Sequence, residues 1–284
     1  MKGTGSSSFV GILGWPLEQT LSPVIHNVAF RRLALDWTYL SWPVEPRLLG
    51  DAVRGLRALG ARGANVTMPH KETVIEHLDE LSGDARAIGA VNTIQRVGDR
   101  LVGHNTDVDG FLEFLAGDAG FDAAGRRALV LGAGGAARAV MKALDGLGAA
   151  EVSVAARSAE KAGAVAALAQ RAAARVEQWD AAPKAAGKAD LVVNATPLGA
   201  AGEHALPGTA LRPGQCVVDL LYVPPSTPLV DAARAAGAQA WGGLGMLVRQ
   251  AAASFTIWTG QAAPIEAMSA AAIHAINARS RAFG

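Results

Sequence analysis

The sequence lacks several features that would place it in other classes of protein. It has one cysteine, Cys216, so no disulfide can form within the chain, and this usage is typical of a reducing cytoplasm. No apolar run reaches the ~18 residues that would span a membrane. The first residues, "MKGTGSSS", lack the apolar core of a secretion signal. We therefore expect a cytoplasmic protein with no membrane partner.

An excess of charge of one sign is also lacking, since 26 Lys and Arg residues balance 25 Asp and Glu residues and leave a net charge of +1. The basic residues are scattered and form no stripe, which argues against nucleic acid as a partner. The six histidines match no metal-binding motif, because His70 and His77 have no ligand-type spacing and no cysteine lies near them. We expect no bound metal.

Half of the 284 residues are hydrophobic, enough to bury the core of one large or two ordinary domains. Strand and helix patterns alternate, which predicts a parallel or mixed α/β sheet. A hairpin is expected over 90–107 with Gly98-Asp99 at its turn, and a second α/β unit begins near Gly125. The expected strands are 8–15, 36–44, 61–68, 151–157, 174–179, 189–197, 215–222 and 238–243, and the expected helices are 22–35, 46–59, 158–170, 227–237, 246–260 and 264–283.

The stretch "LVLGAGGAARA" joins a buried strand to a helix. It contains Gly132-x-Gly134-x-x-Ala137, which fits the dinucleotide-binding pattern, and its place between strand and helix strengthens the match. Gly132 allows the tight turn, Gly134 lets backbone N–H groups approach a pyrophosphate, and Ala137 lets helix and strand pack closely. The helix N-terminus then faces the phosphates. The alternative is a glycine-rich turn that binds nothing.

The end of the following strand indicates which dinucleotide is bound. An NAD site needs an acidic side chain there for the ribose 2′-hydroxyl, but this sequence has Arg157 and Ser158, with Lys161 one helical turn further on. Arg157 can bind a 2′-phosphate with two hydrogen bonds and Lys161 can add a positive charge. The sequence therefore predicts NADP. The alternative is that Arg157 ends a strand and contacts only water.

A lysine stands in an unusual place in "NVTMPHKETV", residues 65–74. Pro69 ends the preceding strand, and apolar residues then recur at helical spacing. We therefore expect Lys71 in the first turn of a helix, where the helix dipole favours acids over bases. A solvated surface lysine is the alternative to a functional one.

Seven stretches, taken together and in order, resemble the shikimate dehydrogenase family over essentially the whole chain. Any one of them alone would be weak, but their joint occurrence by chance is negligible. They are "GWPLEQTLSPVIHN" (14–27), "NVTMPHK" (65–71), "GAVNTI" (89–94), "GHNTDVDGF" (103–111), "NATPLG" (194–199), "DLLYVPPSTPL" (219–229) and "GGLGMLVRQA" (242–251).

The resemblance implies an α/β fold with an N-terminal mixed α/β substrate domain over 1–110 and a Rossmann-type NADP-binding domain over 111–243. The C-terminal helices, 244–284, would pack back onto the first domain, with the active site in the cleft between the domains. Family members reversibly reduce 3-dehydroshikimate to shikimate with NADPH, in the chorismate route to the aromatic amino acids. Some also oxidise quinate.

The resemblance also implies roles for individual residues. Lys71 and Asp107 would be the catalytic pair. The hydroxyl groups of Thr20, Ser22 and Tyr222 would hold the carboxylate of the substrate. The ring hydroxyls of the substrate would be held by Asp107 and by three further polar side chains, Thr67, Asn92 and Gln250. The cofactor residues would be Gly132, Ala133, Gly134, Gly135, Ala136, Ala156, Arg157, Ser158, Lys161, Ala195, Thr196, Leu220, Gly243 and Met246.

Structural alternatives stay open for several of these residues. Ser22 precedes Pro23 and is also a good helix N-cap. Asn92 and Asp107 are residue types that often occur in turns, and Tyr222 could pack against the prolines that follow it. For Gln250 we favour substrate contact, because it lies amid apolar helix residues and a buried amide needs a partner. We expect structural roles for His26 and His70.

Two positions depart from the family pattern. Gln19-Thr20 stands where the family more often has His-Ser, and the extra methyl group of Thr20 narrows the carboxylate end of the pocket. Ala156 stands where NADP-using relatives commonly have Asn. The preference for shikimate over quinate, or for one cofactor, therefore stays open, as does a non-catalytic ligand sensor on the same fold. A monomer and a homodimer are equally compatible with the sequence.

Overall fold

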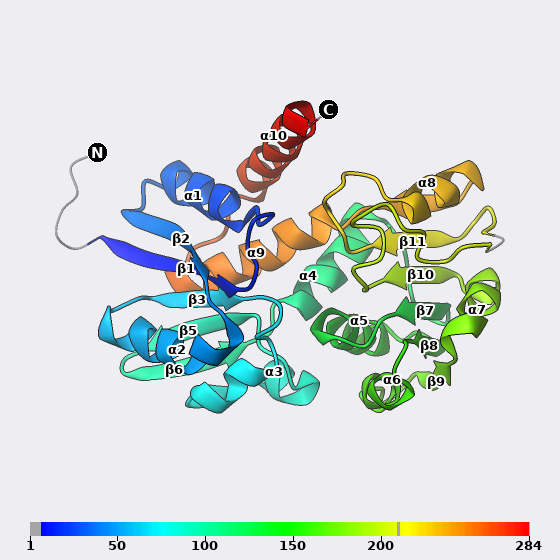
Figure 1. Cartoon of the computed structure of the whole chain (residues 1–284), viewed down its shortest axis with the longest axis horizontal. Helices are drawn as coiled ribbons and strands as arrows, with labels where there is room; N and C mark the ends of the chain where they lie inside the picture. Colours follow the sequence, from blue (N-terminus) through cyan, green and yellow to red (C-terminus); the bar gives the residue numbers. More distant parts are fainter. Residues whose placement is uncertain (1–6, 209–210, 284) are drawn as a thin grey trace. The chain divides into compact units, whose positions relative to one another are not determined.

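The computed structural model describes residues 7–208 and 211–283 (Figure 1). These residues form two compact units. The first unit comprises residues up to 106 together with those from 248 onward, and the second comprises residues 107–247. Each unit contains one six-stranded sheet.

The sheet of the first unit is mixed, with the strand order β2-β1-β3-β5-β6-β4. β1 pairs in parallel with β2 and β3, whereas β3–β5 and β5–β6 are antiparallel. The predicted hairpin is confirmed, because Val97 pairs with Arg100 and Gly98 takes the positive φ of 62° that such a two-residue turn requires. The strands are β1 Ser8–Gly14, β2 Trp37–Pro43, β3 Gly63–Val66, β4 Glu80–Leu81, β5 Thr93–Val97 and β6 Arg100–His104.

Helices cover this sheet, and the last two come from the C-terminal part of the chain. α10 packs against α1, and Arg279 donates hydrogen bonds to the carbonyl oxygens of Gln19 and Thr20 just before α1 begins. The predicted return of the C-terminal helices to the first domain is therefore confirmed, and Figure 1 shows α10 beside α1. The helices are α1 Ser22–Arg32, α2 Leu49–Ala58, α3 Gly83–Ile88, α9 Leu244–Thr259 and α10 Ile265–Phe283, of which α9 starts in the second unit.

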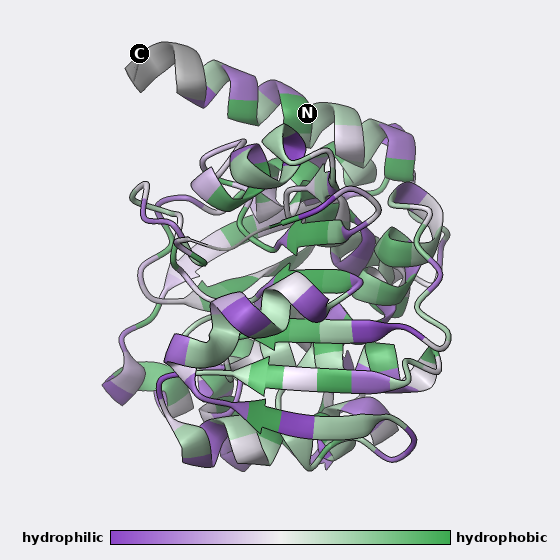
Figure 2. Cartoon of the chain, turned by 90° about the vertical axis from the view of Figure 1, so that its right-hand side faces the viewer, coloured by the Kyte–Doolittle hydropathy of each residue, from purple (hydrophilic) through white to green (hydrophobic). Residues whose placement is uncertain are grey.

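The sheet of the second unit is wholly parallel, with the order β12-β11-β10-β7-β8-β9. Numbered within the unit, this is the 3-2-1-4-5-6 order of the Rossmann-type fold, whose order reverses between β7 and β10. The predicted fold class, α/β with a mixed and a Rossmann-type sheet, is confirmed. Figure 2 shows the central strands as largely hydrophobic ribbons, as expected where a parallel sheet is buried on both faces, whereas the edge strand β9 is mostly exposed. The strands are β7 Arg127–Leu131, β8 Glu151–Ala155, β9 Ala173–Glu177, β10 Leu191–Asn194, β11 Cys216–Asp219 and β12 Gln239–Trp241.

Two helices of this unit were not predicted from the sequence, α4 and α7. α4 begins inside the polar stretch at Asp107 and contains Gly110, and α7 is only seven residues long and carries Pro183 in its first turn, so neither shows a clear helical period. The helices of the unit are α4 Asp107–Glu113, α5 Gly135–Gly146, α6 Ala159–Ala166, α7 Ala182–Lys188 and α8 Pro228–Ala235.

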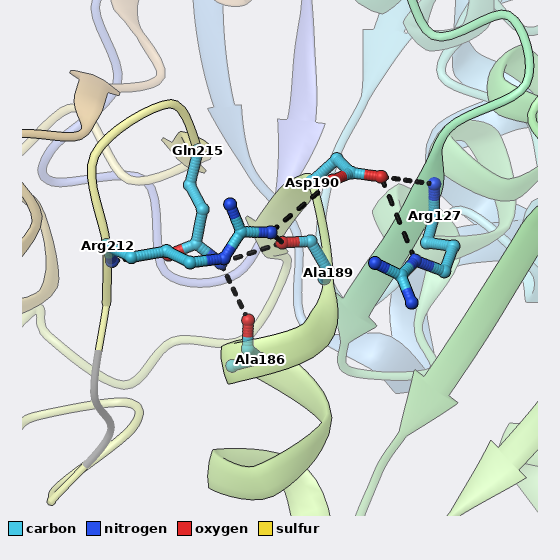
Figure 3. Close-up of polar contacts among 6 residues, drawn as sticks. All are labelled: Arg127, Ala186, Ala189, Asp190, Arg212 and Gln215. Atoms are coloured by element: carbon cyan, nitrogen blue, oxygen red, sulfur yellow. Dashed lines mark hydrogen bonds and ion pairs between the residues drawn. The ribbon is translucent and has the colours of Figure 1, made fainter.

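A polar cluster ties together the amino ends of the central strands in the second unit (Figure 3). Asp190 accepts a hydrogen bond from the Arg127 backbone N–H at 3.0 Å and forms an ion pair with Arg212 at 3.4 Å. Burial acts to raise the pKa of Asp190, but the Arg127 hydrogen bond and the two guanidinium charges outweigh it and lower the pKa. Gln215 donates to the Ala186 and Ala189 carbonyls at 2.8 and 2.7 Å. This cluster lies at the amino ends of the strands, so we assign it to stability and look for the cofactor at the carboxyl ends.

Candidate active site

Lys71 lies in a turn between β3 and a short 3-10 helix at Thr73–His77, so its predicted place in the first turn of a helix is wrong. The turn is held by His70, whose N–H donates to the Thr67 carbonyl at 2.9 Å and whose buried Nε2 lies 2.7 Å from the Val44 carbonyl. These bonds give His70 the structural role expected for it. Lys71 is half-buried, and its carbonyl accepts a 2.7 Å hydrogen bond from Val91.

Asn92 follows Val91 and is almost fully buried. Its Oδ1 accepts hydrogen bonds from the Thr106 N–H at 2.8 Å and the Thr93 hydroxyl at 3.0 Å. Its Nδ2 donates to the Thr106 hydroxyl at 3.0 Å and to Gln250 Oε1 at 3.5 Å. The structure thus brings together two of the predicted substrate residues, Asn92 and Gln250. A local turn role does not explain Asn92, because two of its partners, Thr106 and Gln250, lie far away in the sequence.

Thr20 and Ser22 form a second cluster at the start of α1. Their hydroxyl oxygens are 3.3 Å apart, and the Ser22 N–H also donates to Thr20 Oγ1 at 3.3 Å. Leu21 occupies the N-cap position and Ser22 is the first helical residue, so the alternative that Ser22 caps the helix is wrong. The two hydroxyls lie at the positive end of an 11-residue helix, where a carboxylate is favoured.

Asp107 is the first residue of α4 and is 5% exposed. It directly follows Thr106, whose N–H and hydroxyl are both bonded to Asn92. The backbone of Lys71 is bonded to Val91, on the other side of the same asparagine. The backbone of Lys71 and the residue before Asp107 are therefore both fixed to the segment 91–92.

The glycine turn of the second unit has the geometry that the dinucleotide pattern requires. Gly132 has a φ of 108°, and a Cβ added there would lie 2.8 Å from the Ala195 carbonyl oxygen, so only glycine fits. Gly134 is the N-cap of α5 and is exposed, and a Cβ added there would meet no atom within 4 Å among the described residues. Ala137 is fully buried, as expected where helix and strand pack closely. The turn thus leaves an open cradle in front of a 12-residue helix.

The residues expected at the 2′-phosphate follow β8. Arg157 is exposed, and the Ser158 hydroxyl accepts a 3.2 Å hydrogen bond from the Lys161 N–H as the N-cap of α6. Lys161 is exposed in the first turn of the same helix. Two cations and a helix N-terminus therefore lie at the carboxyl end of β8, where the adenosine ribose is placed in Rossmann-type folds.

A buried polar network that the sequence analysis missed lies at the carboxyl ends of β10 and β11. Asp219 accepts hydrogen bonds from Asn194 Nδ2 at 3.0 Å, the Leu221 N–H at 3.1 Å and the Thr227 hydroxyl at 2.7 Å. Burial raises the pKa of Asp219, against the effect of these three donors. Asn194 Oδ1 in turn accepts from the Thr196 N–H and hydroxyl at 3.0 and 2.7 Å. The sequence does indicate this network, because a polar residue ends each of the two apolar strand segments, Asn194 in β10 and Asp219 in β11.

This network positions the segments that carry three predicted cofactor residues, Thr196, Leu220 and Gly243. The Gly243 N–H donates to the Leu221 carbonyl at 2.8 Å, and a Cβ at Gly243 would collide with the backbone of Leu220. Met246 is buried and Tyr222 is half-buried. The predicted residues of the second unit therefore lie at the carboxyl ends of β7, β8, β10, β11 and β12 and in the segments that follow these strands.

Neither a metal site nor a membrane span is found in the part of the chain that the structure describes. There, no group of three or more His, Cys, Asp and Glu side chains is arranged to hold a metal ion. No described helix is both long and apolar enough to cross a membrane.

The Rossmann-type sheet, the open glycine cradle and the cations after β8 define a dinucleotide-binding protein with a second, hydroxyl- and amide-rich unit, as in dehydrogenases of small polar substrates. Comparison with known families agrees along the chain. The shikimate dehydrogenase substrate binding domain matches residues 12–94, the shikimate / quinate 5-dehydrogenase family matches 115–201, and the shikimate 5'-dehydrogenase C-terminal domain matches 243–273.

Individual proteins are similar over nearly the whole chain. The shikimate dehydrogenase (NADP(+)) of Geobacter metallireducens is 44% identical over 271 residues, covering 92% of this chain and 94% of its own. A crystal structure of a shikimate dehydrogenase in complex with NADP+ superposes with a TM-score of 0.88 at 35% identity, covering 96% and 97% of the two chains. The Listeria monocytogenes enzyme, in complex with shikimate and NAD, gives a TM-score of 0.87 at 34% identity over 95% and 98%. The chain belongs to the shikimate dehydrogenase family, which confirms the resemblance seen in the sequence.

Proposed function

We propose that the protein is an NADP-dependent shikimate dehydrogenase in which Lys71 and Asp107 form the proton-transfer pair. It is an oxidoreductase of the shikimate pathway that interconverts 3-dehydroshikimate and shikimate, and NADP is its cofactor. The observation that carries this conclusion is the similarity of its sequence and fold to shikimate dehydrogenases over more than nine-tenths of the chain.

The residues of the second unit fit NADP. The absence of a side chain at Gly134 leaves room for a pyrophosphate in front of α5, and a side chain at Gly132 would block the turn that forms this cradle. Exposed Arg157 and Lys161 would hold the 2′-phosphate, with Ser158 fixing the start of α6 between them. When bound, the cofactor supplies or accepts the hydride. The remaining cofactor residues of the resemblance, such as Thr196 and Met246, stay proposals.

The hydroxyl pair Thr20 and Ser22 supports a role in binding the substrate carboxylate. An anion there would receive the Ser22 O–H and, once the Thr20 hydroxyl turns away from Ser22, the Thr20 O–H, together with the positive end of α1. We further propose that Asn92 and Gln250 bind ring hydroxyls, because a triol acid needs short polar partners and the two amides lie together. Thr67, Asp107 and Tyr222 complete the proposed substrate residues. On this assignment the first unit is the substrate-binding domain and the second is the NADP-binding domain.

Lys71 has the chemistry that reduction of a ketone needs. Hydride transfer to the carbonyl carbon leaves negative charge on the oxygen, which an ammonium group can stabilise and protonate. Such general acid–base help contributes roughly 10²–10⁴ in rate. The Asp107 carboxylate would accept and return the proton that Lys71 exchanges with the substrate. The Lys71 carbonyl is bonded to Val91, and Thr106, the residue before Asp107, is bonded to Asn92, which supports the action of the pair on one substrate.

A dehydrogenase with broader use of quinate is the second candidate, because the matched family includes quinate enzymes. The methyl group of Thr20 beside the proposed carboxylate site argues against the bulkier quinate. A steady-state assay at 340 nm, the absorbance of the reduced nicotinamide, compares shikimate and quinate with NADP+ and NAD+. We expect the highest kcat/KM for shikimate with NADP+. A higher value for quinate would favour the second candidate, and ligand binding without any absorbance change would indicate a sensor.

Cellular location and assembly are further proposals. The single cysteine, Cys216, is free and buried, which fits a protein of the reducing cytoplasm. The active form is proposed to be a monomer or a homodimer, which light scattering of the purified protein distinguishes.

A further inference from the structure

A buried serine on α9, Ser254, lies at the centre of the hydrogen bonds that surround Asn92. Its hydroxyl is 2.8 Å from the Thr93 hydroxyl, 3.2 Å from the Thr106 hydroxyl and 3.0 Å from Asn65 Nδ2. It also donates to the Gln250 carbonyl at 3.0 Å, one turn earlier on the helix. Ser254 is 0% exposed, so all these groups are satisfied within the protein.

The donors and acceptors in this cluster fix the orientation of the Asn92 amide. Because Thr93 gives its one hydroxyl proton to Asn92 Oδ1, Ser254 is the donor to the Thr93 hydroxyl as well as to the Gln250 carbonyl, and its oxygen accepts from Asn65 and from the Thr106 hydroxyl. Thr93 accepts from Asn65 and donates to Asn92 Oδ1, and Thr106 accepts from Asn92 Nδ2. Asn92 Oδ1 is therefore occupied by protein donors, and the Nδ2 end is directed toward Gln250.

The same serine also fixes α9 to the sheet of the first unit. The helix is bonded to β5 at two further points, where Trp258 Nε1 donates to the Ile94 carbonyl and Gln95 Nε2 donates to the Ile257 carbonyl, both at 2.9 Å. Ser254 adds a bond to Thr93 in the same strand and lies one turn after Gln250. The position of Gln250 relative to Asn92 therefore depends on Ser254.

From this arrangement we infer that Ser254 is a positioning residue for substrate binding, which acts through Asn92 and Gln250 and does not itself touch the substrate. The inference rests on the proposed function, which assigns those two amides to the ring hydroxyls. Loss of the Ser254 hydroxyl would free Thr93 and Thr106 to take other hydrogen-bond arrangements and would loosen the Asn92 amide.

The test uses Ser254→Ala in the full chain, with kcat and KM measured separately for shikimate and for NADP+. We expect the KM for shikimate to rise about fivefold, the effect of roughly one hydrogen bond, with the KM for NADP+ unchanged. Thr256→Ala is the matched control, because Thr256 is exposed on the same helix and its hydroxyl makes the same type of bond, to the Ala252 carbonyl at 3.1 Å. It should leave both constants unchanged. Should Ser254→Ala fail to fold, Ser254→Cys is slightly larger, retains a weaker hydrogen-bond donor and should raise the same KM less.

Combination with Asn92→Ala shows whether the effect passes through the asparagine. If it does, Ser254→Ala has little further effect on kcat/KM for shikimate once Asn92 is removed, as expected of coupled residues. Fully additive effects, or an unchanged KM for shikimate in a variant that only melts earlier, would overturn the inference. Failure of the proposed function itself is a different result, since the unaltered protein would then not oxidise shikimate at all.

Discussion

Acid sensitivity of the first unit should depend on one buried histidine, His26. Its ring is stacked on Tyr39 with centroids 4.4 Å apart and an interplanar angle of 1°, and it also contacts Phe30 and Trp258. Neither ring nitrogen has a hydrogen-bond partner among the described residues. Burial lowers the pKa of His26 from 6.5 to about 3, so the ring stays neutral in the folded protein at pH 5.

The sign and size of the effect follow from proton linkage. Above pH 6.5 the ring is neutral in both states and contributes no pH dependence. Below pH 6.5 the unfolded chain binds a proton that the folded protein does not. The free energy of unfolding therefore decreases as the pH is lowered, until about pH 3, where the folded state is protonated too. Integrated between pH 7.5 and 5.0, this difference lowers the free energy of unfolding by about 2 kcal/mol.

Replacement of His26 by Phe keeps the aromatic stacking and removes the titration. Urea unfolding followed by circular dichroism at pH 7.5 and 5.0 should show that His26→Phe loses about 2 kcal/mol less than the unaltered protein over this interval. Phe30→Leu is the control, because it weakens the same cluster without removing a titrating group and should cost the same at both pH values. Equal losses in the unaltered protein and in His26→Phe would refute the reasoning.

Three further substitutions test the cofactor and substrate assignments. Arg157→Ala should lower kcat/KM for NADP+ by about tenfold with little effect on NAD+, because it removes a charge-assisted contact to the 2′-phosphate; an equal effect on both cofactors would contradict this. Asp219→Asn should destabilise the second unit by about 3 kcal/mol in urea unfolding and raise the KM for NADP+, because an amide NH2 group takes the place of a carboxylate oxygen that accepts hydrogen bonds from buried donors. An unchanged unfolding midpoint would contradict this prediction. Thr20→Ser removes one methyl group and should shift the ratio of kcat/KM values toward quinate by a few-fold up to about tenfold, and no shift would remove Thr20 from the specificity argument.

Much of the fold could be predicted because local patterns sufficed. The apolar run before Gly132 and the glycine turn after it predict a strand, a cradle and a helix, and the structure has all three. The pair Gly98-Asp99 predicts the hairpin turn between β5 and β6. Both patterns act over a few residues, so no knowledge of distant partners was needed.

Other features depend on partners far away in the sequence, and for these the local sequence pattern predicted the wrong structure or gave no prediction. The residues after Pro69 carry a helical period, but the His70 ring is bonded to Val44 and the Lys71 carbonyl to Val91, which hold a turn and a 3-10 helix in its place. Ser22 has the right residue type for an N-cap, yet Leu21 takes that position.

The site residues divide in the same way. Asn92 could be named from its motif, but its partners Thr106 and Gln250 lie 14 and 158 residues away and show only in three dimensions. Ser254 stands in an apolar helix with no motif of its own, so only the structure shows its place at the centre of the cluster.

The role of Lys71 is the central claim, and its replacement by Ala tests that claim most directly. With shikimate and NADP+, the variant should lose roughly 10²–10⁴ in kcat, while the KM for shikimate changes by no more than a modest factor, because the lysine acts mainly on charge that develops in the transition state. Near-normal turnover in a folded Lys71→Ala protein would contradict the account.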